Sequence, residues 1–544
     1  NRQVDVYMRL KEDAPEKALR PYTIDDVYVF ARFSLADSLY NADTIRFENY
    51  HYIPDENYVR ARHLMPSIFL EKGRLYARQD HLLTIRRLMG LGAYKYANID
   101  YAEDTLNAGK LDAFIYVTPA LKKSLRLEAQ MVTKSNNLAG PGLTASFRNR
   151  NAFKGSELLT LNLIANYENQ IGGQAKESRT PLGLSSYELG VRTDLTLPRF
   201  ITPFKVNNLR SESVPHTRIS LGYSYLSRVE FFTMNSYTGS YSYNWKPRKT
   251  VTYEVTPVNL QFVRLANTTP AFDSVLQANQ FLRRSFEQQF ILGSIFQHTY
   301  DTRVYENRTS NFFNRFNIDL SGNVANAFKT LIGADAPDDD NPRSIVGQPF
   351  SQYTRVENDF RYYFNLSKES VIATRFIAGA GFAYGNSSTL PYVKQFTIGG
   401  PNSIRAFRAR SIGPGSYDIP DDLAFSYFDQ TGDMKLEANI EYRFPISGWF
   451  KGALFVDAGN IWLLEESESR PGGEFKASRF MNELAVGTGF GLRVDVEFFV
   501  IRFDFGIPVR IPSDSNDQQN VLPEFRPGLG ENGMILNIAI GYPF

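Results

Sequence analysis

From about residue 120 to its end, the chain repeats segments in which apolar and polar side chains alternate strictly. In 435–444 one face carries Leu436, Ala438, Ile440, Tyr442 and Phe444, and the other carries Lys435, Glu437, Asn439, Glu441 and Arg443. Side chains two residues apart point to the same side of a β-strand, so this period predicts antiparallel strands with one apolar and one polar face. No other feature constrains the fold as strongly.

About 16 such segments, each roughly 10 residues long, follow one another, and the connections between them alternate between short and long. Short connections include 366–370 and 445–449, and long ones include 324–350 and 386–431. Short turns at one end and long loops at the other are typical of outer-membrane barrels. The segments begin near Leu121, Leu143, Leu158, Tyr187, Arg218, Ser236, Val251, Ser285, Asn311, Tyr353, Val371, Lys435, Gly452, Leu484, Val500 and Met534.

We therefore expect a mainly β fold, a transmembrane antiparallel β-barrel of about 16 strands. A soluble all-β protein gives the same alternation, because its sheets bury one face and leave the other in water. Three features favour the barrel: 31 Tyr and 42 Phe that can form interfacial girdles, no second layer of helices, and a final strand pattern that runs to Phe544. No segment approaches the roughly 20 apolar residues of a membrane helix.

Residues 1–119 have a different pattern. Tyr22–Arg32, Tyr94–Tyr101 and Leu111–Val117 read as strands, and Gln79–Met89 has the apolar spacing of a helix. These predict a small α+β domain at 21–119 before the barrel at 120–544, with a further strand at Val4–Leu10 in a preceding segment 1–20. Because Asn1 opens directly into that strand, we expect an N-terminal part, with any signal peptide, to be missing.

The composition excludes several kinds of chemistry. The net charge of +2 gives no argument for nucleic acid, and the chain contains no Cys. The histidines form no pair at metal-ligand spacing on one helix. We expect neither an enzyme nor a metal or cofactor site. The histidines are His51, His63, His81, His216 and His298.

One loop stands out among the strands. Residues 399–415 are rich in Gly and Pro and place Arg405 between Ile404 and Phe407. If this loop folds back into a barrel, the polar faces of two later strands offer Glu441 and Asp457. A guanidinium held by two carboxylates makes charge-assisted hydrogen bonds that can pin a loop. A solvent-facing loop arginine is the alternative.

The segment 399–407 resembles the signature loop of the BamA/TamA family of outer-membrane assembly barrels, whose core reads Val/Ile-Arg-Gly-Phe/Tyr. Ile404, Arg405 and Phe407 match that core, and Ala406 stands in place of its Gly. The segments 441–445 and 455–462 are similar to the family's next two strands, which carry the acidic partners of the loop arginine. Phe544 resembles the aromatic residue that ends the family's last strand.

The resemblance extends to the N-terminal part: residues 22–119 are similar to a POTRA module, and Val4–Leu10 to the last strand of another. Within the family the chain looks closest to the TamA-like lipoproteins of Bacteroidetes, called TamL, although the Cys that would carry the lipid is not in this chain.

The resemblance implies a function without covalent chemistry. The first and last barrel strands would meet at a weak lateral seam whose unpaired backbone groups template an incoming strand. The expected partners are outer-membrane lipids, nascent outer-membrane proteins as clients, and periplasmic or membrane proteins that bind the POTRA domain. The alternatives are a two-partner-type secretion translocator and a passive outer-membrane channel. The expected seam residues are Leu125, Leu127, Leu536, Ile538, Ile540 and Phe544.

Overall fold

The computed structural model describes residues 15, 20–33, 44–53, 59–103, 107, 109–133, 138–170, 185–203, 211–229, 232–278, 289–305, 308–333, 342–345, 347–417, 430–496, 499–512 and 533–544. The expected strand Val4–Leu10 lies outside these residues. The chain divides into two compact units. The first comprises 1–125, 147–160 and 194–217, and the second comprises 126–146, 161–193 and 218–544.

The first unit contains a five-stranded sheet with the order β2-β3-β1-β5-β4. Strand β1 pairs in parallel with β3 and β5, whereas β2 with β3 and β4 with β5 are antiparallel. The elements are β1 (Thr23–Phe30), β2 (Ile45–Phe47), β3 (Tyr50–Ile53), α2 (Ala61–Leu64), the 3-10 turn η2 (Met65–Ser67), α3 (Arg78–Gly90), β4 (Tyr94–Glu103) and β5 (Lys110–Pro119).

Helix α3 and strands β1, β4 and β5 match the expected helix and strands of 21–119 to within a few residues. Alternate residues of β1, such as Val27 and Val29, are buried in one core with Leu88 of α3. Gly92 follows the helix with φ of +71°, a conformation that favours glycine, and so ends it. The short elements β2, β3 and α2 fall in a stretch whose pattern predicts no element.

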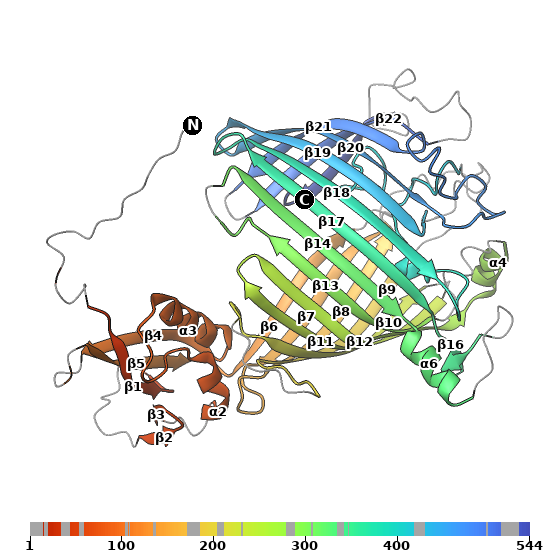
Figure 1. Ribbon diagram of the computed structural model, residues 1–544. Coiled ribbons are helices and arrows are strands. Elements are labelled where there is room, and N and C mark those ends of the chain that lie inside the picture. Colours follow the sequence, from red (N-terminus) through yellow and green to blue (C-terminus); the bar gives the residue numbers. More distant parts are fainter. Residues whose placement is uncertain are drawn as a thin grey trace. The chain divides into compact units, whose positions relative to one another are not determined.

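The second unit is dominated by a 16-stranded sheet in which each strand pairs with its neighbours in chain order (Figure 1). Its strands are β6 (Lys123–Thr133), β7 (Leu138–Asn149), β8 (Leu158–Gln170), β9 (Ser186–Leu197), β10 (His216–Arg228), β11 (Phe232–Arg248), β12 (Val251–Thr268), β13 (Gln289–Asp301), β14 (Ser310–Ser321), β17 (Tyr353–Asn365), β18 (Val371–Ala383), β19 (Met434–Ser447), β20 (Phe450–Trp462), β21 (Ala485–Asp495), β22 (Val500–Arg510) and β23 (Ile535–Ile540).

The expectation of a mainly β fold with about 16 antiparallel strands is confirmed. The long connections carry small elements of their own. Among the described residues, no helix is long and apolar enough to cross a membrane. The small elements are α4 (Pro270–Ala278), α6 (Asn323–Leu331), the two-stranded β15 (Ser344–Ile345) and β16 (Gln348–Pro349), and the 3-10 turn η3 (Tyr392–Lys394).

The apolar face of this sheet is exposed and its polar face is buried, which is the reverse of the pattern in a soluble protein. On β19 the apolar Ile440 is 56% exposed, while its neighbour Glu441 is 0% exposed. Leu454 and Val456 on β20 are likewise exposed, and Asp457 beside them is buried. A soluble sheet buries its apolar face, whereas a membrane barrel turns that face to lipid and keeps polar side chains inside. The burial pattern therefore favours the membrane protein over the soluble alternative.

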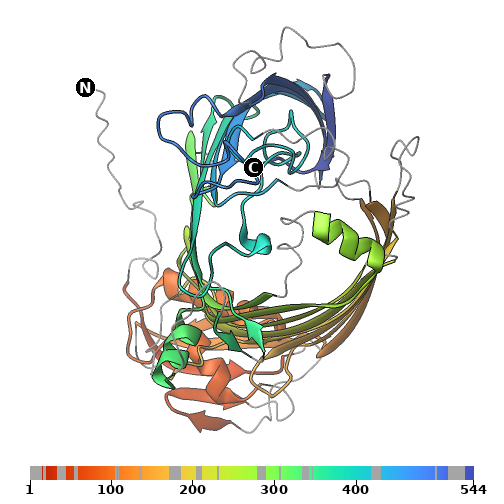
Figure 2. The same ribbon diagram turned by 90° about the vertical axis from the view of Figure 1, so that its right-hand side faces the viewer.

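Strands β6 and β23 stand at the two ends of the sheet order, and no pairing joins them among the described residues. Strand β23 has 6 residues, and its only partner in that part of the chain is β22. Figure 2 shows the sheet curving around the connection between β18 and β19. This connection contains the loop that the sequence singles out.

Candidate functional site

The connection 386–431, called the inner loop below, is described at 386–417 and 430–431. It folds back on itself, because Gly400 N donates to Phe407 O at 2.9 Å and Arg410 N donates to Ile398 O at 2.8 Å. Gly399 has φ of +93°, and its neighbour Gly400 also has a positive φ. These two glycines allow the tight turn of 400–407 in which Arg405 lies.

Arg405 is buried and held by carboxylates from two adjacent strands. Its Nε donates to Asp457 Oδ2 at 2.9 Å and its Nη2 to Asp457 Oδ1 at 3.0 Å, a forked pair. Its Nη1 contacts Glu441 Oε2. The guanidinium also lies 3.5 Å from the centre of the Phe455 ring, a cation–π contact. Arg405 thus joins the inner loop to β19 and β20.

Charged side chains from β21 and β22 lie next to Arg405 and Glu441. Arg493 Nη1 lies 2.6 Å from Asp504 Oδ1 and its Nη2 lies 3.4 Å from Glu441 Oε1. Arg502 donates to Asp504 at 3.2 Å and to the inner-loop carbonyl of Pro401 at 2.8 Å. These side chains are buried and connected to one another, which is the condition for ionic groups to be tolerated away from water. We call Arg405, Glu441, Asp457, Arg493, Arg502 and Asp504 the inner cluster.

Polar contacts outside the inner cluster also bind the loop. Ser403 Oγ donates to Glu437 Oε2 at 2.6 Å, and Asn439 Nδ2 donates to the Ser403 carbonyl at 3.1 Å. Asn439 also donates to Asp457 Oδ1 at 3.0 Å. The inner face of β19 therefore holds the loop at successive polar positions.

Glycines on β21 and β22 provide the space that the loop backbone occupies. A Cβ atom added to Gly506 would lie 2.5 Å from Arg405 O and 2.7 Å from Ala406 Cα. One added to Gly487 would collide with the Ala406 side chain. Gly487 of β21 and Gly506 of β22 thus mark where the loop packs on the sheet. Ala406 itself has no positive φ, so its backbone does not require the Gly of the resembled motif.

The loop also carries an apolar cluster that packs against the same strands. Ile404 and Phe407, the neighbours of the Arg405–Ala406 pair, are buried in it with Ile461 of β20 and Ala485 of β21. Ionic contacts and apolar packing therefore act on the same few loop residues. The other members are Phe396, Ile398, Ala406 and Ile412.

The sheet and its inner loop agree with the comparisons to known proteins. A model of the Omp85 superfamily domain matches residues 143–532, which is more than half of the chain. The chain belongs to the Omp85 superfamily.

One curated relative of this Omp85 protein is a distant homologue. The outer membrane protein assembly factor BamA of Neisseria meningitidis serogroup B is 25% identical to it over 186 residues, which are 31% of this chain and 23% of that protein. The match therefore spans less than a quarter of the curated relative. Omp85 membership and this homology support the outer-membrane location that the sequence predicts.

Solved structures resemble the fold. The crystal structure of BamA from Haemophilus ducreyi lacking POTRA domains 1–3 has a TM-score of 0.55 and 14% identity, covering 92% of this chain and 82% of that chain. CdiB from Acinetobacter baumannii has a TM-score of 0.47 and 11% identity, covering 95% of this chain and 92% of that one. At these identities the BamA likeness bears on the fold alone.

The structure brings together all five residues that the motif of this Omp85 protein singles out: Ile404, Arg405, Phe407, Glu441 and Asp457. The sequence reasoning missed Arg493, Arg502 and Asp504. All three lie on the polar faces of β21 and β22, so the alternation of polar and apolar residues places them on the inner face of the sheet. Their contact with the loop depends on strand register, which the pattern does not specify.

The expected seam residues lie in three places. Leu125 and Leu127 are exposed on β6, and Leu536, Ile538 and Ile540 are exposed on β23, the other end strand. Phe544 lies beyond β23 and is buried with Phe313, Tyr363 and Ala373 of β14, β17 and β18. Arg443 Nη2 donates to its carbonyl oxygen at 3.2 Å. Phe544 is therefore separated from the strand edge on which the sequence places it.

Proposed function

We propose that this Omp85 protein inserts or translocates outer-membrane proteins through the edges of β6 and β23. The observation that carries the proposal is that, in the described part of the chain, these strands end the sheet order, while each of the other 14 strands has a neighbour on both sides. An unpaired edge presents N–H and C=O groups that an incoming strand can pair. In lipid such pairing is strongly favoured, because no water satisfies those groups.

The short length of β23 supports the same proposal. It has 6 residues, whereas β6 has 11. Gly541, with φ of +84°, follows the strand directly, so the backbone leaves the edge there. A seam between strands of unequal length has few hydrogen bonds to break before a client strand enters. The name of the Neisseria relative, an outer membrane protein assembly factor, agrees with this activity.

The proposal gives the inner loop a supporting role. Arg405 and the rest of the inner cluster hold the loop against β19–β22, close to one end of the sheet. The loop would keep these strands in shape while the seam opens. A loop packed there also argues against a permanently open passive channel.

We extend the proposal to the first unit as a POTRA domain. Its elements β1, α3, β4 and β5 follow the strand–helix–strand–strand order that the sequence predicts, with β2, β3 and α2 between β1 and α3. Strand β4 is at one end of its sheet order and β2 is at the other. The unit would act in the periplasm, where β4 offers an edge to clients or partner proteins. The TamA-like lipoprotein subgroup, which the motifs resemble, is the finer form of this proposal.

Cysteine crosslinking tests the seam, since the chain contains no Cys of its own. Pairs of Cys with one member in Lys123–Thr133 and one in Ile535–Ile540 are joined by a short bifunctional reagent. The measurement is the insertion of a client barrel before and after crosslinking. The matched control joins Phe360→Cys to Phe376→Cys, a directly paired position of β17 and β18.

We expect the seam crosslink to stop client insertion and the control crosslink to leave it unchanged. A single Cys in β6 should also form adducts with a client strand that carries a Cys. Undiminished insertion by a protein with a fully crosslinked seam would refute the proposed function.

A further inference from the structure

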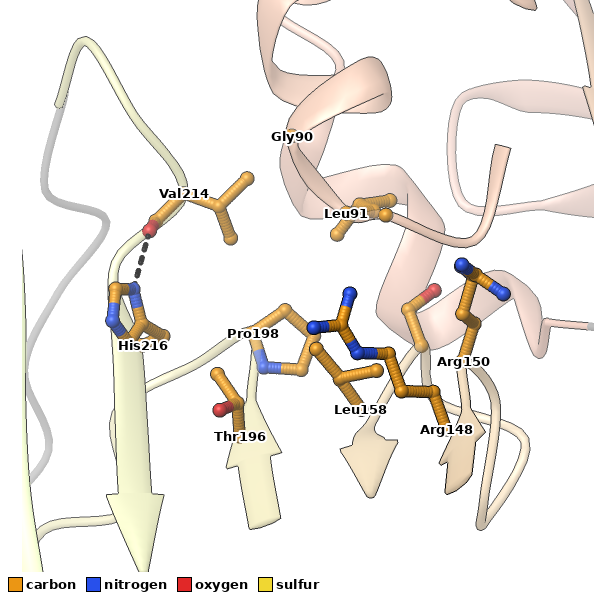
Figure 3. Close-up of a pocket in the computed structure, with 11 residues that line it drawn as sticks. Gly90, Leu91, Arg148, Arg150, Leu158, Thr196, Pro198, Val214 and His216 are labelled. Atoms are coloured by element: carbon orange, nitrogen blue, oxygen red, sulfur yellow. Dashed lines mark hydrogen bonds between the residues drawn. The ribbon is translucent and has the colours of Figure 1, made fainter. Parts of the chain in front are cut away.

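A cavity of about 190 Å³ lies within the first unit (Figure 3). Its lining comes from the residues that follow α3, Leu91 and Gly92, and from the ends of β7 and β9 and the beginnings of β8 and β10. All of its lining residues belong to the first unit. The proposed function makes no use of this cavity.

Two arginines line the cavity, Arg148 near the end of β7 and Arg150 directly after it, and none of the lining residues is acidic. Figure 3 shows the guanidinium groups of Arg148 and Arg150 extending from the strand ends toward Leu91. Arg150 Nη1 is oriented by hydrogen bonds of 3.1 Å to Leu121 O and to Ser124 Oγ. Arg148 Nε is buried and has no hydrogen-bond partner among the described residues.

A second buried polar atom in the lining also lacks a partner in that part of the chain. Ser156 is 2% exposed, and its Oγ makes no hydrogen bond with the described residues. Its backbone is fixed, because Ser156 N donates to Asn151 Oδ1 at 3.0 Å. Buried polar atoms are almost always hydrogen-bonded, so an unpartnered hydroxyl beside two arginines indicates a ligand with acceptor atoms.

Nearby acidic side chains are engaged elsewhere. Glu157 lies 3.1 Å from Arg199 and accepts a 2.8 Å hydrogen bond from Gly155 N. Glu212 is paired with Arg86. Arg87 adds a positive charge near the cavity. Its Nη1 donates a hydrogen bond to the carbonyl oxygen of Ser213, and the next residue, Val214, lines the cavity. Burial lowers the pKa of Arg87 to about 10, which leaves it charged at neutral pH.

We propose that this cavity binds the phosphate group of a phospholipid. Two guanidinium groups and a hydroxyl suit the several acceptor oxygens of a phosphate. The adjoining turn carries Phe153, which is 60% exposed and can contact the acyl chains of the same lipid. This inference rests on the outer-membrane location and not on the proposed insertion activity.

The test measures lipid binding by the full chain purified in a phosphate-free detergent. Native mass spectrometry counts the bound phosphatidylglycerol, and a thermal-shift titration with inorganic phosphate at constant ionic strength forms the second arm. The variants are Arg148→Gln, Arg150→Gln and Ser156→Ala. Lys249→Gln is the control, because Lys249 is an exposed cation in another short turn, outside the cavity.

We expect Arg148→Gln and Arg150→Gln each to weaken phosphatidylglycerol binding about tenfold, since each removes a charge-assisted hydrogen bond. Ser156→Ala should weaken it less, and Lys249→Gln should match the unchanged protein. If the protein binds inorganic phosphate but not phosphatidylglycerol, the cavity is a phosphate site, and the proposal that its ligand is a phospholipid is overturned. Equal binding by the Arg variants and the control, or binding of an acidic peptide with no response to either phosphate probe, would overturn the proposal.

Discussion

The side-chain amide of Asn537 donates a hydrogen bond to the backbone carbonyl oxygen of Arg405, with 2.8 Å between nitrogen and oxygen. Asn537 belongs to β23, one end strand of the 16-stranded sheet, and Arg405 is the central residue of the inner loop. The strand proposed to open thus contacts the loop proposed to hold its neighbours. This hydrogen bond links the position of β23 to the position of the inner loop.

Replacing Asn537 by Ala removes this link. The Arg405 carbonyl loses a partner in a buried setting, which costs about 1–3 kcal/mol. We expect β23 to exchange its backbone amide hydrogens faster, as measured by mass spectrometry on the peptide 533–544. Ile538→Ala is the control, because Ile538 lies on the opposite, exposed face. Unchanged exchange in Asn537→Ala would show that the bond does not hold the strand.

Replacing Arg405 by Ala leaves Asp457 buried without its guanidinium partner. Breaking one side of a buried ion pair costs about 3–5 kcal/mol. The thermal unfolding temperature should therefore fall markedly, and Arg405→Lys should recover only part of the loss because Lys cannot form the forked pair. Arg408→Ala, an exposed arginine of the same loop, is the control. An Arg405→Ala protein as stable and as active as the control would contradict a structural role for Arg405.

Replacing Gly506 by Ala places a Cβ atom within 3.0 Å of the loop backbone at Arg405 and Ala406. Since backbone atoms cannot move aside cheaply, we expect a loss of about 1–3 kcal/mol and faster proteolysis within the inner loop. Gly239→Ala on β11 serves as the control, because its nearest neighbour would be 3.7 Å away. Equal proteolysis of the two variants would mean that the loop does not rest on Gly506.

The turn between β7 and β8 should respond to pH through Glu157. Burial alone would raise the pKa of Glu157, but backbone hydrogen bonds and Arg199 lower it below its ordinary value of 4.5. A lowered folded-state pKa contributes stability above pH 4.5 that is lost as the pH falls through the folded-state value.

Glu157→Gln tests this dependence directly. We expect it to reduce the free energy of unfolding by about 1.5–3 kcal/mol at pH 7, since it weakens hydrogen bonds to a charged group. The difference from the unchanged protein should shrink below pH 4.5, as measured by chemical unfolding in detergent. A difference in the free energy of unfolding that is the same at pH 7 and at low pH would contradict the lowered pKa of Glu157.

Much of the fold could be predicted from the sequence because strand alternation is a local property. A residue such as Ile440 reveals its face through its immediate neighbours, and the same holds for each of the 16 strands. The helix α3 was predictable for a similar reason, since its apolar spacing lies within 13 residues. The short strands β2 and β3 were missed, because 3 and 4 residues carry no measurable period.

The candidate site was only partly predictable. Arg405, Glu441 and Asp457 were found through the motif, which combines a rare loop composition with acids on two later strands. Asn537 and Asp504 were missed, because every polar-face residue looks alike until the register of β22 and β23 is known. Phe544 follows Gly541, whose positive φ ends the strand. The alternation continues through Tyr542 and Phe544, and therefore gave no signal of that break.

The contacts of Arg405 span very different lengths of chain. Its partner Asp457 lies 52 positions later, whereas Asn537 lies 132 positions later. Strands that fold in chain order can therefore give the loop its first anchor well before its last. The loop reaches its full set of contacts only when β23 has joined the sheet, so the hydrogen bond from Asn537 to Arg405 reports that the final strand is in place.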